Sequence, residues 1–228
     1  GVQTCALPIL LLDTERDRAP GLAKKLSMYN LRSKVTVADV SADREAAVAY
    51  GSDAARALGL ENSVTFVDPR LAVLGVRVIA PAGQAATLLQ ARGFSAAPVE
   101  SYDAVRLTLG VPDGSRDLPV EKALLLESGF DELNGVDWKK GCYMGQELTA
   151  RTKYRGLVKK RLFPVKVEGA LPAPGTAIER NGEEVGEIRS GAGNRALAML
   201  RLEALEGALT AGGARIVPQK PDWMKLPD

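Results

Sequence analysis

The chain has 228 residues, of which 46% are apolar, enough for one large hydrophobic core or two modest ones. The 30 Lys and Arg residues nearly balance the 28 Asp and Glu residues, so the net charge of +2 gives no global basic field typical of nucleic-acid-binding proteins. The sequence contains no histidine, which excludes Ser-His-Asp and Cys-His nucleophile pairs and histidine-based zinc sites.

Residues 1–9 correspond to the one-frame translation of a common short-read sequencing adapter. We interpret them as an assembly artefact that is not part of the fold, and we expect them to pack poorly. The chain is then expected to lack the N-terminal part of its folded domain and of its binding pocket. The alternative is a natural arm whose residues 6–12 form an edge strand.

With Cys5 set aside, Cys142 is the one remaining thiol. This excludes an internal disulfide and a four-thiolate metal site, and it fits a reducing compartment.

The first two thirds of the chain alternate between strand and helix patterns. Residues 10–13 are typical of the end of a buried strand, and Pro20 favours a helix start that places Leu22, Leu26 and Tyr29 on one face. A later helix is expected to pack Val105 and Leu109 inward. The pattern predicts an α+β domain with a largely antiparallel sheet. Its further expected elements are strands at 34–38, 63–67 and 73–80, a short helix at 52–58 closed by Gly59, and helices at 82–92, ending at Gly93, and 102–109.

The pattern changes after Gly156. Short strands of 5 to 9 residues follow, separated by Pro- and Gly-rich turns. Asn181-Gly182, between residues 176–179 and 185–188, is the strongest hairpin signal in the sequence. Residues 191–195 indicate a turn and not a dinucleotide fingerprint, since they do not open a helix. We therefore predict a small antiparallel C-terminal barrel, with domains at 10–156 and 157–228.

The densest chemistry lies in Lys-Gly-Cys-Tyr-Met-Gly-Gln-Glu, residues 140–147. Glycines near Cys142 suggest a tight backbone path that lets the segment approach a ligand or another strand. The ammonium groups of Lys139 and Lys140 would favour the thiolate, the nucleophilic and metal-binding form of cysteine. The alternative is a small buried cysteine in a turn. A cluster or metal at Cys142 would need further ligands from a partner.

A basic segment surrounds this motif. Residues 139–161 carry eight basic side chains and one acid, Glu147, a net charge of +7 in a chain of +2, so the remainder carries −5. Such a segment favours an anionic partner: the glutamate tail of a folate, a phosphate or RNA. The alternative is a solvated strand edge protected by lysines.

The motif at residues 140–147 resembles the signature of the YgfZ family of folate-binding proteins, relatives of the glycine-cleavage T protein. The resemblance extends from about Leu10 to Trp223, and residues 148–152 and 160–164 are most similar to the alphaproteobacterial and mitochondrial branch. It implies a folate-binding α+β region followed by a C-terminal β-barrel, tetrahydrofolate or a related reduced folate as cofactor, and Cys142 as the functional thiol. The polar groups in matching segments, which it implies as cofactor-binding residues, are Arg106, Glu121, Lys140, Gln146, Glu147 and Arg151.

The resemblance also implies a function. We expect a folate-dependent accessory factor for assembly or repair of iron-sulfur clusters, with cluster assembly proteins and client iron-sulfur enzymes as partners, no membrane association, no direct nucleic-acid binding and no resident metal. Because the chain carries Thr108 where the T protein has a pterin-binding glutamate, glycine-cleavage chemistry is not expected. The alternatives are a tetrahydrofolate-dependent one-carbon transferase and an RNA-facing module in tRNA modification. A bacterial cytoplasmic location is expected.

Overall fold

The computed structural model describes residues 9–226, and the chain forms two compact units. Unit 1 comprises residues up to Val67 together with Val76–Ser95, and unit 2 comprises Asp68–Gly75 and residues from Ala96 onward. The prediction that residues 1–8 pack poorly lies outside the described residues, while the side chain of Ile9 is exposed. Within the described residues, no helix has the length and apolar character needed to cross a bilayer.

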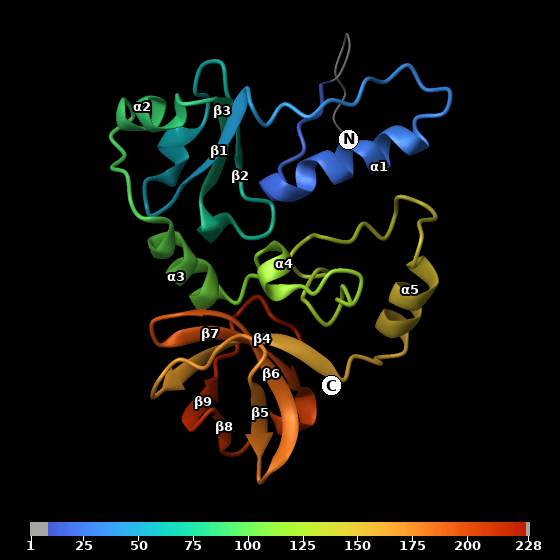
Figure 1. Ribbon diagram of the computed structural model, residues 1–228, viewed down its shortest axis with the longest axis vertical. Coiled ribbons are helices and arrows are strands. Elements are labelled where there is room, and N and C mark those ends of the chain that lie inside the picture. The colour runs from blue at the N-terminus through green and yellow to red at the C-terminus, as the bar shows by residue number, and fades with distance from the viewer. Residues whose placement is uncertain (1–8, 227–228) are drawn as a thin grey trace. The chain divides into compact units, whose positions relative to one another are not determined.

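Unit 1 is built on a three-stranded antiparallel sheet (Figure 1). The strand order is β1-β3-β2, with Ala46 opposite Ile79 and Thr65 opposite Val78. Its core contains Leu60 and the inward-facing valines and alanines of β1 and β3. The elements are η1 (Arg16–Arg18), α1 (Ala19–Tyr29), β1 (Arg44–Ala49), η2 (Ala54–Ala57), β2 (Val64–Val67), β3 (Val76–Pro81) and α2 (Ala85–Gln90), where η denotes a 3-10 helix.

Several sequence predictions in unit 1 are confirmed and several are wrong. β2, β3, α2 and the short helix closed by Gly59 are present, and Pro20 lies in the first turn of α1. Residues 10–13 and 34–38 are not strands, because neither segment pairs with another, and Leu10 is 80% exposed. The strand β1 was missed because its sequence, Arg-Glu-Ala-Ala-Val-Ala, has weak β-propensity. No residue of α1 is buried.

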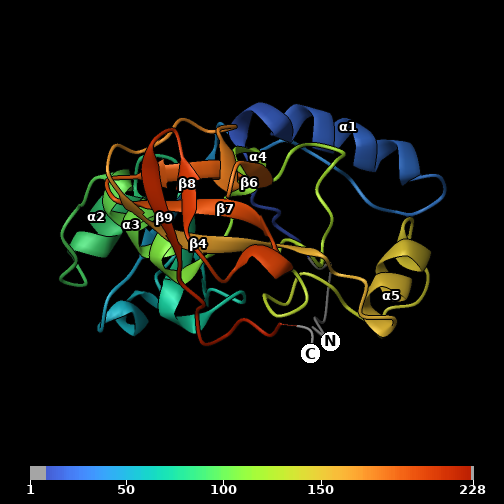
Figure 2. The ribbon, with the colours of Figure 1, turned by 90° about the horizontal axis from the view of Figure 1, so that it is seen from below.

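Unit 2 contains a closed antiparallel barrel, as predicted. Its strand order is β4-β7-β6-β5-β8-β9. Figure 2 shows these strands from below, with α5 (Gln146–Tyr154) well away from them. Asn181 and Gly182 both have positive φ, the conformation that a tight primed hairpin turn requires, so the hairpin predicted there is confirmed. The strands are β4 (Lys160–Glu168), β5 (Ala177–Arg180), β6 (Glu183–Ala192), β7 (Arg195–Arg201), β8 (Leu209–Ala211) and β9 (Ala214–Pro218).

Helices pack on this barrel. Leu107 of α3 (Val99–Leu109) is buried against Leu162 and Leu197 of the barrel. Gly110 ends α3 with φ +75°, and a Cβ there would lie 2.8 Å from Cδ of Pro164, so the helix end approaches β4 too closely for a side chain. The remaining elements of unit 2 are η3 (Ala72–Leu74), α4 (Gly114–Asp117), α5 (Gln146–Tyr154) and η4 (Leu202–Ala204).

The inward face of α3 differs from the prediction. Leu109 packs against Leu74, Val111 and Leu133 as expected, but Leu107 is the fully buried residue and Val105 is only partly covered.

The compact units also do not divide at residue 156, since residues 96–156 group with the barrel. The predicted domain boundary therefore differs from the division by compactness. The observed mixture of helices, antiparallel sheet and closed barrel confirms the fold class.

Candidate functional site

The motif at residues 140–147 forms an exposed loop that runs into α5. Cys142 is a free, exposed thiol. Gly141 has φ +90° and Gly145 has φ +83°, and a Cβ at either position would have no atom within 4 Å. These glycines are thus required by the left-handed backbone and not by the close approach of another segment that the sequence suggested. The loop presents the thiol to solvent, which excludes the alternative of a buried cysteine.

Hydrogen bonds within the motif close the loop. The backbone N–H of Gln146 donates to the carbonyl of Tyr143 at 3.1 Å, and the side-chain Oε1 of Gln146 accepts from the N–H of Tyr143 at 3.3 Å. The Nζ of Lys140 lies 5.0 Å from the centre of the Tyr143 ring, a cation–π contact. Gln146 and Lys140, both predicted to bind a cofactor, therefore also shape the loop that carries Cys142.

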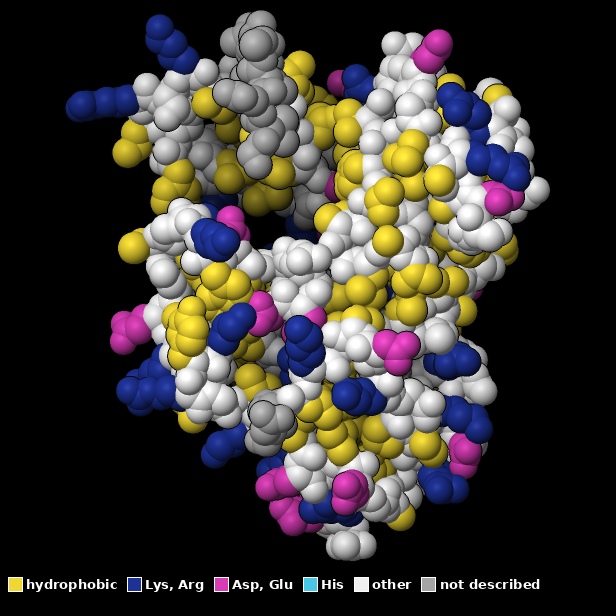
Figure 3. Space-filling model, turned by 180° about the vertical axis from the view of Figure 1, so that it is seen from behind, with side chains coloured by type: hydrophobic (Ala, Val, Ile, Leu, Met, Phe, Trp, Pro, Cys, Tyr) yellow, Lys and Arg dark blue, Asp and Glu magenta, His cyan; other side chains and the backbone are white. Residues whose placement is uncertain are grey.

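The helix that follows has the charge pattern its dipole favours. Glu147 lies in the first turn of α5, and Arg151 and Lys153 lie in the last. Gly145 before the helix and Gly156 after it both have positive φ and mark its ends. Glu147 and Arg151 are exposed. Figure 3 shows Lys and Arg side chains gathered over the region of α5, on the left of that view.

A second set of contacts ties the loop and α5 to the body of unit 2. Asp131 accepts a 2.7 Å hydrogen bond from Nε1 of Trp138 and a 2.6 Å bond from Nζ of Lys153. That Nζ also lies 4.3 Å from the Trp138 ring centre, and the ring meets Tyr154 edge-on. Burial raises the pKa of Asp131, but hydrogen bonds from Lys153 and Trp138 outweigh it and hold the pKa below its ordinary value. Sequence reasoning missed this anchor, because Asp131 and Lys153 lie 22 positions apart without a local pattern.

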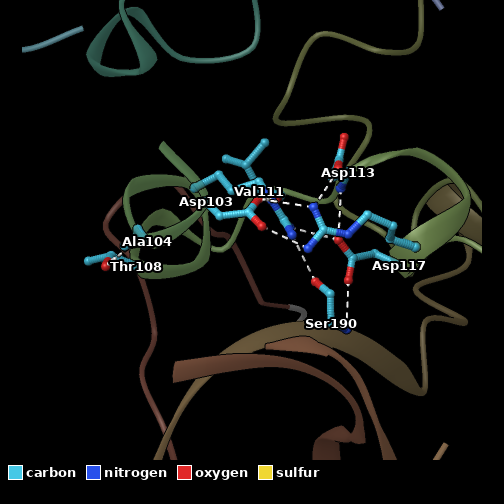
Figure 4. A network of polar contacts seen from close by, with 9 residues as sticks. Asp103, Ala104, Thr108, Val111, Asp113, Asp117 and Ser190 are labelled. Carbon is cyan, nitrogen blue, oxygen red and sulfur yellow. Dashed lines mark hydrogen bonds and ion pairs between the residues drawn. The ribbon is translucent and has the colours of Figure 1, made fainter. Parts of the chain in front are cut away.

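Arg106 lies in a buried polar network (Figure 4). It is 4% exposed and donates to Asp103 at 2.6 Å, Asp117 at 2.8 Å, Ser190 Oγ at 2.9 Å and the Val111 carbonyl at 3.4 Å. Asp117, fully buried, also accepts from the backbone N–H of Ser190 at 3.0 Å. The network joins α3 and α4 to strand β6 of the barrel.

These contacts bear on the predicted cofactor residues. Protein acceptors use the N–H groups of Arg106, which favours a structural role, although its binding to folate stays a prediction. Thr108 points away from the network and donates its hydroxyl to the carbonyl of Ala104 at 2.7 Å. Glu121 is exposed with φ +62°. The structure therefore brings Lys140, Cys142 and the residues of α5 together on one segment, while Arg106 belongs to a different part of unit 2.

Within residues 9–226, no group of three or more acidic or cysteine side chains could hold a metal ion. Cys142 could supply one ligand to a metal or cluster, and further ligands would have to come from another molecule. Its exposed thiol could equally act as a nucleophile or exchange disulfides.

Comparisons with known proteins agree with this architecture. Residues 159–226 match the family described as "CAF17, C-terminal beta-barrel domain". Aminomethyltransferase T of the glycine cleavage system from Bartonella henselae has a similar fold, with a TM-score of 0.51 and 14% identity over 66% of this chain and 46% of that one. At this identity the likeness concerns the fold alone.

Two curated relatives extend the likeness beyond the barrel. The mitochondrial iron-sulfur cluster assembly factor IBA57 of Mus musculus is 38% identical over 95% of this chain. That of Homo sapiens is 37% identical over 93%. The chain spans 64% of the length of each. Because these relatives are named as mitochondrial, the predicted bacterial cytoplasmic location is wrong, and the comparisons support neither the narrower YgfZ assignment nor the alphaproteobacterial one. Over most of its length the chain is similar to iron-sulfur cluster assembly factors named IBA57, and its barrel matches the CAF17 C-terminal domain.

Proposed function

We propose that the chain is part of a mitochondrial iron-sulfur cluster assembly factor in which Cys142 is the functional thiol. The observation that carries this proposal is the exposed thiol held between two left-handed glycines at the start of α5, in a segment of net charge +7. The likeness to assembly factors named IBA57 supports a role in iron-sulfur cluster assembly. The cluster is substrate here, and Cys142 would act as a transient ligand or redox thiol that meets it through a partner protein.

The proposal is tested by substituting Cys142→Ala in cells that depend on this protein. We expect the activity of an iron-sulfur enzyme to fall several-fold, while a cluster-free enzyme in the same cells is unchanged. Met144→Ala is the matched control, because Met144 is an exposed residue of the same loop, 82% accessible. Full iron-sulfur enzyme activity with Cys142→Ala, at normal protein level, would remove the thiol from the proposal.

We propose tetrahydrofolate binding as a separate property. The contacts favour some of the residues predicted to bind it over others. Lys140 and Arg151 are exposed cations near Cys142 and suit the glutamate tail of a folate. Arg106 suits the cofactor less well, because protein acceptors already use its N–H groups. Glu121 and Glu147 are the exposed carboxylates predicted as acceptors. When bound, a reduced folate would supply one-carbon or redox chemistry beside the thiol.

Calorimetric titration of the full-length protein with monoglutamyl and polyglutamyl tetrahydrofolate checks this. We expect tighter binding of the polyglutamate, with the difference reduced by salt and by Arg151→Gln. Arg195→Gln, an exposed arginine of β7, should have no effect. Equal affinity for both forms would remove Lys140 and Arg151 as tail ligands.

The two alternative functions gain no support from the contacts. A one-carbon transferase that binds pterin as the T protein does would need a carboxylate at residue 108, and Thr108 instead donates its hydroxyl within α3. The relatives described above are named for cluster assembly and not for RNA modification.

A further inference from the structure

A pocket of about 520 Å³ lies within unit 2, between the C-terminal end of α5, the start of β4 and the segment after the barrel. It has a volume typical of small-molecule sites. None of the predicted thiol or folate residues lines it, so it is separate from the site proposed above.

The lining charges of the pocket are unbalanced. Arg161 donates to Glu132 at 2.9 Å, and Lys153 donates to Asp131 at 2.6 Å, so the two lining acids each have a basic partner. Arg155 and Lys225 also line the pocket and form no ion pair with a described carboxylate, while the charge of Lys225 helps to lower the pKa of Asp131. The four lining cations and two lining acids leave a net charge of +2.

Arg161 contributes positive charge to the wall of the pocket. Arg161 is almost fully buried; its Nη1 donates to the carbonyl of Leu126 at 3.0 Å and its Nη2 to Glu132. Its Nε is buried and has no hydrogen-bond partner. Because this Nε is buried, an occupant of the open pocket cannot reach it. The Arg161 guanidinium instead contributes positive charge behind the pocket wall, which an anionic group would meet.

Apart from Thr152, whose hydroxyl donates to the carbonyl of Leu148, the uncharged lining residues are apolar or glycine. Leu126, Val158 and Leu226 line the pocket together with Gly156, which adds no side chain. Cations beside aliphatic walls match a molecule with an anionic head and a short hydrocarbon body. A free inorganic anion would use the cations alone and leave these walls in water.

We propose that this pocket binds a small organic anion, with its carboxylate or phosphate head against Arg155 and Lys225 and its apolar body against Leu126, Val158 and Leu226. The site does not depend on folate binding or on Cys142, so the two sets of experiments can fail independently.

The test is an NMR titration of the chain with glutarate, using inorganic phosphate and the neutral glutaramide as comparison ligands. We expect saturable shifts of the Arg161 Nε–H and Gly156 N–H resonances with glutarate, weaker binding of phosphate and none of glutaramide. Arg155→Gln with Lys225→Gln should weaken glutarate binding about tenfold, since each exposed ion pair contributes a few-fold.

The matched control is Arg195→Gln with Lys220→Gln, which changes the net charge equally at exposed positions outside the pocket. Binding to this control should stay within twofold. Equal loss in both double variants, binding of glutaramide, or shifts that never saturate would overturn the proposal. Phosphate binding as tight as glutarate would overturn the role of the apolar walls. Because Arg155 and Lys225 are exposed, both variants should keep the thermal midpoint of the parent chain.

Discussion

Two charged regions of unit 2 carry arginines and lysines for opposite purposes. Around Arg106, two carboxylates and a hydroxyl consume the guanidinium donors inside the protein. Around Cys142, Lys139, Lys140 and Arg151 stay exposed and have no described carboxylate partner. The same residue type therefore stabilises the fold in one region and remains available to a ligand in the other. What separates the two roles is whether the chain itself supplies the acceptors.

The largest expected effect that tests this comparison comes from Arg106→Leu. The substitution leaves the buried Asp117 without its cation, which should lower the free energy of unfolding of unit 2 by about 3–5 kcal/mol. Both tryptophans, Trp138 and Trp223, lie in unit 2, so urea unfolding followed by tryptophan fluorescence reports on this unit. Arg151→Leu should change the value by less than about 0.5 kcal/mol. A loss below about 1 kcal/mol for Arg106→Leu would mean that its donors are not structural.

Two glycines provide the next test. Gly110→Ala adds left-handed strain of about 1–2 kcal/mol to a contact of 2.8 Å with Cδ of Pro164, so unit 2 should lose about 2–4 kcal/mol. Gly141→Ala has the strain without the contact and should cost only about 1–2 kcal/mol. The same fluorescence measurement compares them. Equal losses would show that the approach of α3 to β4 does not require a glycine.

Acid should weaken the buried network. Burial raises the pKa of Asp103, but hydrogen bonds from Arg116 and Arg106 outweigh it and hold the pKa below its ordinary value. A carboxylate with a lowered folded pKa contributes stability that is complete above its unfolded pKa, about 3.9, and that is lost as pH falls through the folded pKa. Urea unfolding at pH 6 and at pH 3 should therefore show a smaller acid loss in Asp103→Asn than in the parent chain. Parallel pH curves would contradict this.

The smallest effect on stability is expected for Asp131→Asn, which removes the anchor of the Cys142 loop. Loss of the ion pair with Lys153 should cost unit 2 about 1 kcal/mol or less. Local opening should increase, so trypsin should cleave after Lys139 or Lys140 several-fold faster. Mass spectrometry of timed digests locates the cleavage. An unchanged rate at these two lysines, with faster cleavage elsewhere, would place the anchor's effect outside the loop.

The sequence predicted the barrel better than the rest of the fold, since turn chemistry is local. Asn181-Gly182 adopts the backbone its residues prefer, and the strands on either side follow. The network could not be predicted in this way, because Arg106 and Ser190 lie 84 positions apart. An isolated strand pattern such as residues 34–38 also failed, because a strand needs a partner that its own sequence does not specify. The motif at residues 140–147 located the exposed thiol, but its anchor at Asp131 carried no local signal.

The pairing of β6 with β7 shifts register between Ile188 and Gly191, and Ser190 in this interruption donates its N–H to Asp117 of α4. At this residue a hydrogen bond to helix α4, which lies outside the barrel, takes the place of a hydrogen bond between strands. A chain of residues 157–228 alone would lose the Asp117 acceptor of the Ser190 N–H and the Glu127 carbonyl that accepts from the N–H of Leu162. Folding of the barrel is therefore expected to be cooperative with α4, so that its strands reach their final register only once the segment preceding them has docked.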